Sequence, residues 1–347
     1  MIAAGIMIGS SLDAIDVVAI DVESLSLIEA LAVPFDHGLK TQTLAVVQGQ
    51  AITAYELGVL KQQWSWACIH ALKALKSPID LIGVHGPTIA HAPNGAFPFS
   101  WQLIDAVTLN EHLKIPVVSD FRQRDVASGG QGAPLAPLFH QALLPKETEA
   151  VINLGGVANV TLLHPQPIGF DIGPANALLD ELAMKYLNKS FDEGGQWALS
   201  GQCQTRLLSA LMQEPYIRLS PPKSTGRCYF NLKWLSEYTH DERPRDVANT
   251  LCYWVAHVLA PYLKESRLYY FCGGGVFHGG LMKAFREVLG HPCPSTDEVG
   301  VPAQWLEAMG FAWLAAMRLQ GKRLAGVFPV TGGHTSYLGE VVMQSLA

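Results

Sequence analysis

The sequence is poor in charged residues and has no basic cluster. Asp, Glu, Lys and Arg make up only 16% of its 347 residues, whereas 49% are hydrophobic, and the formal net charge is −6. No run of Lys or Arg forms a local basic patch. Proteins that bind nucleic acid neutralise phosphates with such patches, so we expect no nucleic-acid partner.

Long apolar runs and paired cysteines are missing as well. No apolar stretch approaches the ~20 residues that cross a bilayer, and residues 1–5 lack the basic segment that opens a secretion signal. None of the six cysteines belongs to a Cys-x-x-Cys pair, which suits free thiols in a reducing compartment. We therefore expect a cytoplasmic protein with no membrane partner.

Several catalytic signatures are absent. The chain has no Walker A loop and no Gly-x-Ser-x-Gly elbow, and its histidines lack the spacing of metal ligands. A Rossmann fingerprint must open a helix, but the turns at Gly9 and Gly155 lead directly back into strand-like segments. These absences argue against P-loop, serine-hydrolase and dinucleotide-binding classes.

What the chain does contain is a strand–turn–strand unit that occurs twice. The first copy spans residues 2–20 around Gly9-Ser10-Ser11, and the second spans residues 150–163 around Gly155-Gly156. The breaks are too short for a helix, so each copy is interpreted as a hairpin. Such a repeat, in a chain too long for one simple core, predicts two similar lobes with a cleft between them.

Strand and helix periodicities alternate between and after these hairpins, which indicates the α/β class. The predicted helices cover residues 54–75, 175–187 and 247–262, and the predicted strands cover residues 80–84, 115–118 and 267–271.

Three glycine-rich turns follow apolar strands, at Gly9, at Gly155-Gly156 and at Gly273-Gly274-Gly275. Without side chains, backbone N–H groups can approach the oxygens of a polyphosphate. One such turn is usually only a turn, but three of them, two in a duplicated hairpin, favour a nucleotide site. The third turn, which precedes a helical pattern, suits the nucleoside end of ATP.

The first turn also carries Asp13 and Asp16. A carboxylate at this place could hold hydrated Mg²⁺, and Asp13 is the preferred candidate. Aspartate is also common in turns for local reasons, so a purely structural role is the alternative for both residues.

Asp171 is the candidate general base. The segment 169–176 places its carboxylate at the end of a short strand, just before a helix, where α/β sheets put reacting groups. A general base must be ionised and within hydrogen-bond reach of the proton that it takes. The alternative is that Asp171 only caps the helix at 175–187.

Residues 120–125, Asp-Phe-Arg-Gln-Arg-Asp, precede a glycine loop at residues 129–134. Arginines and carboxylates in this arrangement suit recognition of sugar hydroxyls and a carboxylate, or equally a structural ion-pair network at a hinge. His85, which follows a predicted strand, is ambiguous in the same way. Glu307 lies in the apolar helix at 305–317 and either caps that helix or lines a cleft.

Taken together, these segments resemble the anhydro-N-acetylmuramic acid kinase family, and the likeness runs from Gly5 to about Gly339. The matching segments are Gly9–Asp13, His85-Gly86, Asp120–Arg122 with Gly129–Pro134, Asn153–Asn159, Phe170-Asp171 with Gly173-Pro174 and Asn176, Pro222–Arg227, Cys272–Gly275, and Glu307–Met309 with Phe311–Ala315.

The resemblance implies a two-lobed, actin-like α/β fold of duplicated ribonuclease H-like type, with its active site in the cleft between the lobes. Kinases of this type return their last helix to the first lobe, so we place residues 1–145 and 311–347 in lobe I and residues 146–310 in lobe II. The resemblance also implies a homodimeric enzyme of cell-wall recycling. Such an enzyme uses ATP and Mg²⁺ to open 1,6-anhydro-N-acetylmuramic acid with water while it phosphorylates O6.

The site residues of the family carry over onto the matching positions. Asp171 would be the base that deprotonates the water attacking C1, and Asp13 would meet the metal through water. Substrate contacts are expected from His85, Asp120, Arg122 and Glu307. The nucleotide is expected at Gly9, Ser10, Ser11, Leu12, Asp13, Ala14, Ile15, Asp16, Gly155, Gly156, Gly273, Gly274 and Gly275.

Some positions depart from the family pattern, and each hydrogen bond to a ligand that is lost in this way costs on the order of 1 kcal/mol. Two alternatives therefore stand beside the kinase interpretation. One is a noncatalytic or weakly active nucleotide- or sugar-binding relative, and the other is a kinase of a different substrate, either another anhydrosugar or the hydroxyl group of an ordinary sugar. The departures are Ile8 for serine, Ala14 for glycine, Pro87 for glutamine, Ile104 and Ala106 for glycine and proline beside Asp105, and Ile172 and Ala175 for threonine and glycine near Asp171.

Overall fold

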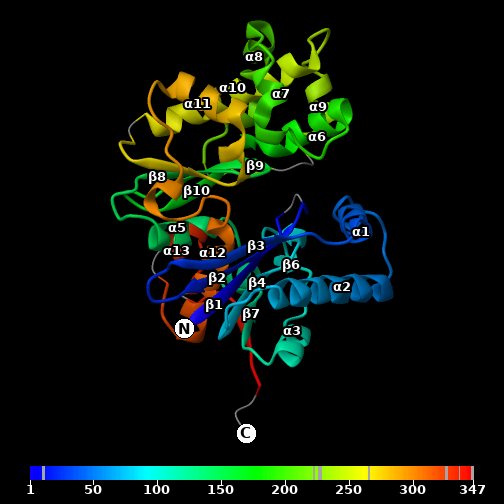
Figure 1. The fold of residues 1–347 in the computed structure, drawn as a ribbon, viewed down its shortest axis with the longest axis vertical. Helices are drawn as coiled ribbons and strands as arrows, with labels where there is room; N and C mark the ends of the chain where they lie inside the picture. Colours follow the sequence, from blue (N-terminus) through cyan, green and yellow to red (C-terminus); the bar gives the residue numbers. More distant parts are fainter. Residues whose placement is uncertain are drawn as a thin grey trace. The chain divides into compact units, whose positions relative to one another are not determined.

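The computed structural model describes residues 1–9, 12–221, 223–225, 229–264, 266–324, 327–335 and 337–344. The chain forms two compact units (Figure 1): residues 1–143 with 305–347, and residues 144–304. Each unit combines a β-sheet with helices, so the predicted two-lobed α/β class is confirmed. Among the helices built from the described residues, none has both the length and the hydropathy of a membrane span.

The first unit is built on a six-stranded mixed sheet in the order β12-β7-β4-β1-β2-β3. β1 pairs with β2 antiparallel and with β4 parallel, and β4 pairs with β7 parallel. The carboxyl ends of β1, β4 and β7 therefore lie along one edge. The strands are β1 (Ile2–Met7), β2 (Ile15–Asp21), β3 (Leu27–Val33), β4 (Leu81–His85), β7 (Val117–Ser119) and β12 (Glu340–Val342), with a separate hairpin of β5 (Thr88–Ala92) and β6 (Phe99–Gln102).

Helix α12 approaches this sheet unusually closely. A Cβ atom at Gly5 of β1 would lie 1.9 Å from the carbonyl oxygen of Ala308, and one at Gly83 of β4 would lie 2.2 Å from that of Phe311. Gly5 and Gly83 are register partners, so the two glycines open one strip of bare backbone for the helix. The helices of the unit are α1 (His37–Val47), α2 (Ala54–Lys73), α3 (Ala106–Leu113), α4 (Phe121–Ala127), α5 (Ala136–Leu143), α12 (Leu306–Leu319) and α13 (Val327–Thr331).

Local sequence explains where α1, α2 and α3 of the first unit begin. Thr53 and Glu56 form a capping box at the start of α2, in which each residue's side chain accepts from the other's backbone N–H. Asp36 and Asp105 cap α1 and α3 with their carboxylates. Residues of α2 and α3 share one apolar core with β1, β2 and β4.

The second unit contains a four-stranded sheet in the order β10-β9-β8-β11. β8 pairs with β9 antiparallel and with β11 parallel, and β9 pairs with β10 antiparallel. This order and these directions repeat those of β3-β2-β1-β4, so the duplicated hairpin belongs to a duplicated, ribonuclease H-like sheet of the actin-like class. The strands are β8 (Ala150–Leu154), β9 (Val157–Leu162), β10 (Ile168–Pro174) and β11 (Tyr269–Cys272).

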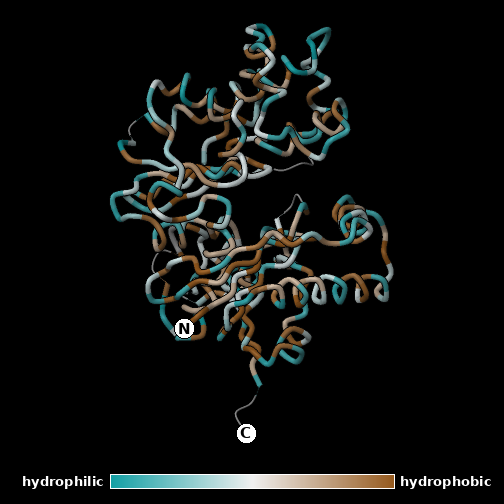
Figure 2. The backbone as a smooth tube through the Cα atoms, in the orientation of Figure 1, coloured by the Kyte–Doolittle hydropathy of each residue, from teal (hydrophilic) through white to brown (hydrophobic). Residues whose placement is uncertain are grey.

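The core of the second unit is rich in aromatic rings. Phe230 packs edge-on against Trp234 and Trp254, with ring centroids 4.8 and 5.8 Å apart. In Figure 2 hydrophobic residues follow the strands of both units. The helices are α6 (Asn176–Leu187), α7 (Gln196–Leu199), α8 (Thr205–Leu211), α9 (Leu232–Ser236), α10 (Pro244–Leu263) and α11 (Gly279–Leu289), with 3₁₀ turns at Glu193–Gly195, Pro215–Arg218, Gly274–Phe277 and Thr296–Val299.

One expected element boundary is wrong at an important place. The strand that carries Asp171 does not end there but continues to Pro174. The register with β9 shifts between Asp171 and Gly173, so the strand is irregular beside the carboxylate. An irregularity of this kind changes the direction of a side chain without ending the strand. The pattern of apolar residues in the sequence does not reveal such an irregularity.

Candidate functional site

Three predicted site positions follow the parallel strands of the first unit. Gly9 comes just after β1, His85 ends β4, and Asp120 follows β7 directly. Because these strands are parallel neighbours, their carboxyl ends lie at the same edge of the sheet. The N–H of Ile8 donates to the carbonyl of His85 at 3.2 Å, which links the first glycine turn to the end of β4.

Arg122, at the start of α4, connects two segments at this edge. Its Nε donates to Nε2 of His85 at 2.8 Å, and its Nη1 donates to the carbonyl of Gly132 at 3.0 Å. The structure therefore brings together the histidine, the arginine and the glycine loop that the sequence singled out. The His85 ring also lies against Phe311, with centroids 4.6 Å apart.

The contacts of His85 determine its protonation. Burial and the neighbouring charge of Arg122 keep the pKa of His85 well below its usual range, so the ring is neutral. Since Nε2 accepts a hydrogen bond, the proton is on Nδ1. Nδ1 is buried and has no partner among the residues that the structure describes. His85 thus offers a neutral donor at the edge of the sheet.

Three carboxylates of the first unit interact electrostatically. Burial raises the pKa of Asp16 to about 7, and the charges of Glu307 and Asp13 add to this effect. Burial also raises the pKa of Glu307, while the charge of Arg122 opposes the change. A cation relieves repulsion of this kind. In the described part of the chain, no three His, Cys, Asp or Glu side chains are arranged to hold a metal ion directly.

Asp13 and Glu307 differ in their surroundings. Asp13 is exposed and pairs with Nζ of Lys40 at 2.8 Å. Glu307 lies in the first turn of α12. Among the described residues, its carboxylate accepts no hydrogen bond from the backbone N–H groups of that helix. The capping alternative for Glu307 is therefore wrong. Ser10 and Ser11, predicted as nucleotide contacts, lie outside the described residues.

The segment 120–125 forms a mixed polar network in the first unit. Asp125 is fully buried and accepts from the Gly132 N–H and from Oγ1 of Thr331, both at 2.7 Å. Arg124 pairs with Glu340 at the surface, at 3.7 Å. Asp120 accepts from Ser119 at 3.0 Å, and burial raises its pKa. Asp125 thus fixes the loop whose Gly132 carbonyl binds Arg122.

The two glycine turns of the second unit lie side by side. Gly155 follows β8 and Gly273 follows β11, and these strands are parallel neighbours. Gly273 has a φ of +82°, and a Cβ there would lie 2.3 Å from Oδ1 of Asn153. At Gly274 a Cβ would meet nothing within 4 Å. Asn176, whose N–H donates to the Gly155 carbonyl at 3.1 Å, fixes the other side of the turn.

Asp171 does not cap the following helix. The N-cap of α6 is Ala175, and no side chain makes a cap hydrogen bond there. Instead Oδ2 of Asp171 accepts from the N–H of Thr225 at 2.9 Å. The capping alternative for Asp171 is wrong as well, and its carboxylate faces a segment that lies about fifty residues further along the chain.

Sequence reasoning missed the residues that hold Asp171. Its N–H donates to the carbonyl of Lys223 and its carbonyl accepts from the hydroxyl of Tyr216, both at 3.0 Å. The only signal was the Lys223-Ser224-Thr225 stretch, which resembles the family but suggests no chemistry by itself.

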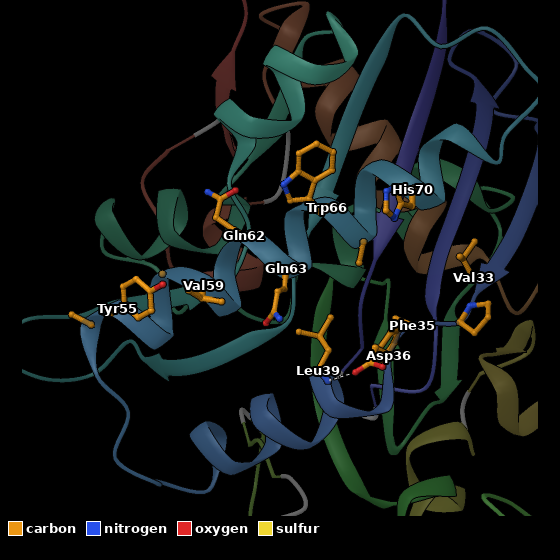
Figure 3. Close-up of a pocket in the computed structure, with 14 residues that line it drawn as sticks. Val33, Phe35, Asp36, Leu39, Tyr55, Val59, Gln62, Gln63, Trp66 and His70 are labelled. Carbon is orange, nitrogen blue, oxygen red and sulfur yellow. Dashed lines mark hydrogen bonds between the residues drawn. The ribbon is translucent and has the colours of Figure 1, made fainter.

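A cavity of about 860 Å³ lies elsewhere in the first unit, beside α2 and the connection from β3 to α1 (Figure 3). Phe35, Tyr55 and Trp66 line it together with the amides of Gln62 and Gln63. Among the residues that the structure describes, none of the predicted nucleotide or sugar contacts lines this cavity. It is therefore separate from the site residues at the sheet edge.

The chain is similar in sequence to proteins of one kinase family over nearly its whole length. The sequence profile described as "Anhydro-N-acetylmuramic acid kinase" matches residues 1–344. A protein of that name from Coxiella burnetii (strain RSA 493 / Nine Mile phase I) is 39% identical over 96% of this chain and 94% of the relative. Another from Xylella fastidiosa (strain Temecula1) is 40% identical over 92% and 90%.

Solved structures are similar at a lower level. The activator of the 2-hydroxyisocaproyl-CoA dehydratase from Clostridium difficile with bound ADPNP aligns with a TM-score of 0.45 and 14% identity, over 92% of this chain and 96% of that one. The ROK hexokinase from Thermus thermophilus aligns with a TM-score of 0.35 and 14% identity, over 92% and 100%. The sequence relatives, at 39% and 40% identity, are far more similar to this chain than these solved structures, at 14% identity. Because the profile and relatives at 39% and 40% identity span more than nine-tenths of it, the chain belongs to the anhydro-N-acetylmuramic acid kinase family.

Proposed function

We propose that this chain opens 1,6-anhydro-N-acetylmuramic acid with water and phosphorylates the released O6 from ATP, which gives N-acetylmuramic acid 6-phosphate in peptidoglycan recycling. One observation carries the proposal: in a chain of this family, Tyr216 and Lys223 hold the backbone of Asp171, and Thr225 holds its carboxylate. A carboxylate fixed in one orientation is what a general base requires.

In the proposed reaction, Asp171 takes a proton from the water whose oxygen attacks C1 of the sugar. The bond from C1 to O6 breaks as the new bond to C1 forms. O6 then attacks the γ-phosphorus of ATP, the bond to the bridging oxygen breaks, and ADP leaves. Finally the proton passes from Asp171 to solvent. The first part resembles inverting glycoside hydrolysis, and the second is a phosphoryl transfer.

The residues present fit a nucleotide and a hydrated cation. The turns at Gly155-Gly156 and Gly273–Gly275 would offer backbone N–H groups to the nucleotide, and the open space beside Gly274 supports this placement. In the first unit, the turn after Gly9 would meet phosphate oxygens, and Asp13 with Asp16 would hold Mg²⁺ through water. Mg²⁺, when bound, neutralises charge on the phosphates.

The sugar would be recognised by the His85–Arg122 pair. The Nδ1–H of His85 is a buried donor that a ligand oxygen would satisfy. A guanidinium at the same place suits the lactyl carboxylate of a muramic sugar. Asp120 and Glu307 would accept from, or donate to, sugar hydroxyls.

We further propose that the protein works as a cytoplasmic homodimer. The five cysteines that the structure describes are free thiols, which suits a reducing compartment. The dimer is an expectation from the family resemblance alone. Size-exclusion chromatography with light scattering of the full chain would test it.

The test of activity is ADP release from Mg-ATP with and without 1,6-anhydro-N-acetylmuramic acid, run beside Asp171→Asn. Asparagine keeps the shape of the side chain but cannot take the proton. We expect sugar-dependent ADP release in the wild type and at least a roughly 100-fold loss in the variant, with ATP binding unchanged. In H₂¹⁸O the label should appear on C1 and not in the phosphate.

Two results would contradict the proposal. A folded protein that binds ATP but releases no ADP with this sugar would be a binding relative. Phosphorylation of a reducing sugar without incorporation of the label would indicate an ordinary hydroxyl-directed kinase.

A further inference from the structure

Residues 214–221 and 223–225 lie along the free edge of the sheet in the second unit, at the position of Asp171. β10 is an edge strand that pairs only with β9 among the strands of this sheet. On its other side, the Asp171 N–H donates to Lys223, its carbonyl accepts from Tyr216, and its carboxylate accepts from Thr225. Every one of these contacts orients Asp171, so the position of its carboxylate depends on this segment.

The segment is anchored at its beginning by a buried carboxylate. Glu214 is 1% exposed and accepts from the Tyr229 hydroxyl at 2.6 Å and from Nε1 of Trp234 and the Tyr238 hydroxyl, both at 2.8 Å. It also accepts from the N–H of Tyr216 at 3.1 Å. Burial opposes the charge of Glu214, but these donors lower its pKa on balance. The backbone of Tyr216 is therefore fixed by an ionised, fully bonded group.

The side chain of Tyr216 is fixed from a second direction. Nζ of Lys223 lies 5.0 Å from the centre of the Tyr216 ring and 5.8 Å from that of Tyr262, and it donates to the carbonyl of Ile217 at 3.2 Å. Lys223 is 9% exposed and Tyr216 is 6% exposed, so this cation–π contact is shielded from water. Burial, and then the charge of Asp171, raise the pKa of Tyr216, so its hydroxyl keeps its proton and stays a donor.

We propose that Tyr216 is a positioning residue for the general base: through its hydroxyl bond to the carbonyl of Asp171, it fixes the strand irregularity that aims the carboxylate at the reacting water. Lys223 and Glu214 hold Tyr216 in place for this task. The inference rests on the proposed function, because it assigns Tyr216 a part in the same reaction. It predicts that Tyr216 affects the chemical step and leaves nucleotide binding unchanged.

The experiment compares two conservative variants of the full chain, Tyr216→Phe and Tyr253→Phe. Both remove one tyrosine hydroxyl from the second unit, but that of Tyr253 donates to Glu287 and not to Asp171. We expect Tyr216→Phe to lower kcat for the anhydrosugar ten- to a hundredfold, since small errors in the placement of a reacting group cost this much. KM for ATP should stay within about twofold. Tyr253→Phe should keep the wild-type kcat.

A double variant separates positioning from a general effect on structure. If Tyr216 acts through Asp171, Tyr216→Phe should cause no further loss in an Asp171→Asn background. Should Tyr216→Phe fail to fold, Lys223→Met replaces it as the test, with Lys185→Met as its control. Lys185 also lies over a tyrosine ring, that of Tyr186, at 5.0 Å.

The outcomes are distinct. Equal kcat values for Tyr216→Phe and Tyr253→Phe, or an additive loss in the double variant, would overturn the positioning role while the kinase function stands. Absence of sugar-dependent ADP release in the wild type would overturn both proposals. We expect Tyr216→Phe to lower kcat in the wild-type background, Tyr253→Phe to leave kcat unchanged, and Tyr216→Phe to have no further effect on kcat in the Asp171→Asn background.

Discussion

Nε of Arg122 donates a hydrogen bond of 2.8 Å to Nε2 of His85 and thereby fixes the tautomer of the imidazole. A guanidinium is always a donor at neutral pH, so Nε2 must accept and Nδ1 must carry the proton. The same arginine reaches the carbonyl of Gly132 through Nη1 at 3.0 Å. One side chain thus sets the chemistry of the histidine and the position of the glycine loop.

Arg122→Lys is expected to weaken sugar binding. Lysine has a single ammonium and cannot reproduce two directed contacts from one planar fork. We expect KM for the anhydrosugar to rise about tenfold or more, with KM for ATP little changed. Steady-state kinetics with each substrate varied in turn would measure both.

Arg124→Lys is the matched control for this prediction. Arg124 lies in the same helix and forms only a surface pair with Glu340 among the ion pairs of the described residues, at 3.7 Å. Such pairs contribute little. An equal rise in KM for both variants would contradict a specific role of the His85–Arg122 pair.

The shifted pKa of Asp16 predicts a pH-dependent stability of the protein without Mg²⁺. The folded pKa is about 7 against an ordinary value of 3.8. Between these values the unfolded chain releases the proton first, so the stability falls as the pH rises through this window. Asp16→Asn should remove the penalty and raise the Tm at pH 8 more than at pH 5. The gain in the free energy of unfolding at pH 8 is at most roughly 4 kcal/mol, because one pKa unit corresponds to about 1.4 kcal/mol.

Scanning calorimetry of both proteins at the two pH values would measure this effect. Asp241→Asn, at an exposed position in the second unit, is the control and should change the Tm little, as surface substitutions usually do. An increase in the Tm of Asp16→Asn that is the same at pH 5 and pH 8 would mean that the surroundings of Asp16 do not raise its pKa.

Gly273→Ala is expected to destabilise the second unit and weaken ATP binding. The residue has a φ of +82°, and a Cβ would come within 2.3 Å of Oδ1 of Asn153 and 2.9 Å of the Leu154 carbonyl. The turn after β11 must then move away from the turn after β8. We expect a loss of about 1–3 kcal/mol, as for other strained backbone positions, and a KM for ATP at least tenfold higher.

Gly274→Ala provides the comparison within the same turn. Its Cβ would meet nothing within 4 Å, so the folded protein should keep a Tm close to that of the wild type. Thermal unfolding of the two variants, followed by titration with ATP, would separate backbone strain from direct obstruction of the nucleotide. Equal losses of Tm would contradict the structural explanation.

The sequence was informative where chemistry and periodicity coincide. The duplicated hairpins, the glycine turns after β1, β8 and β11, and the positions of His85 and Asp120 at strand ends all follow from apolar runs that break at small or polar residues. Parallel pairing then places these ends at common edges, as the α/β class predicts.

The support of Asp171 was not predictable in the same way. Tyr216 and Thr225 reach it from 45 and 54 residues further along the chain, through a segment without regular periodicity. The helix-cap alternatives for Asp171 and Glu307 follow from the preference of carboxylates for the first turn of a helix. That local preference does not show which distant residues a carboxylate contacts in the folded chain. The raised pKa of Asp16 likewise depends first on burial and then on the charge of Glu307, nearly 300 residues away.

The contact between Gly5 and Ala308 also has a consequence for the order of events during synthesis. The ribosome delivers β1 and β4 early, but the helix that covers their glycine strip belongs to residues 305–347, which emerge only after the whole of residues 144–304. The nascent chain therefore carries an uncovered sheet face until its last tenth or so is made. Glu307, adjacent to Ala308, reaches its place in the same closing step, so a truncated chain would have neither a covered sheet nor a complete set of carboxylates.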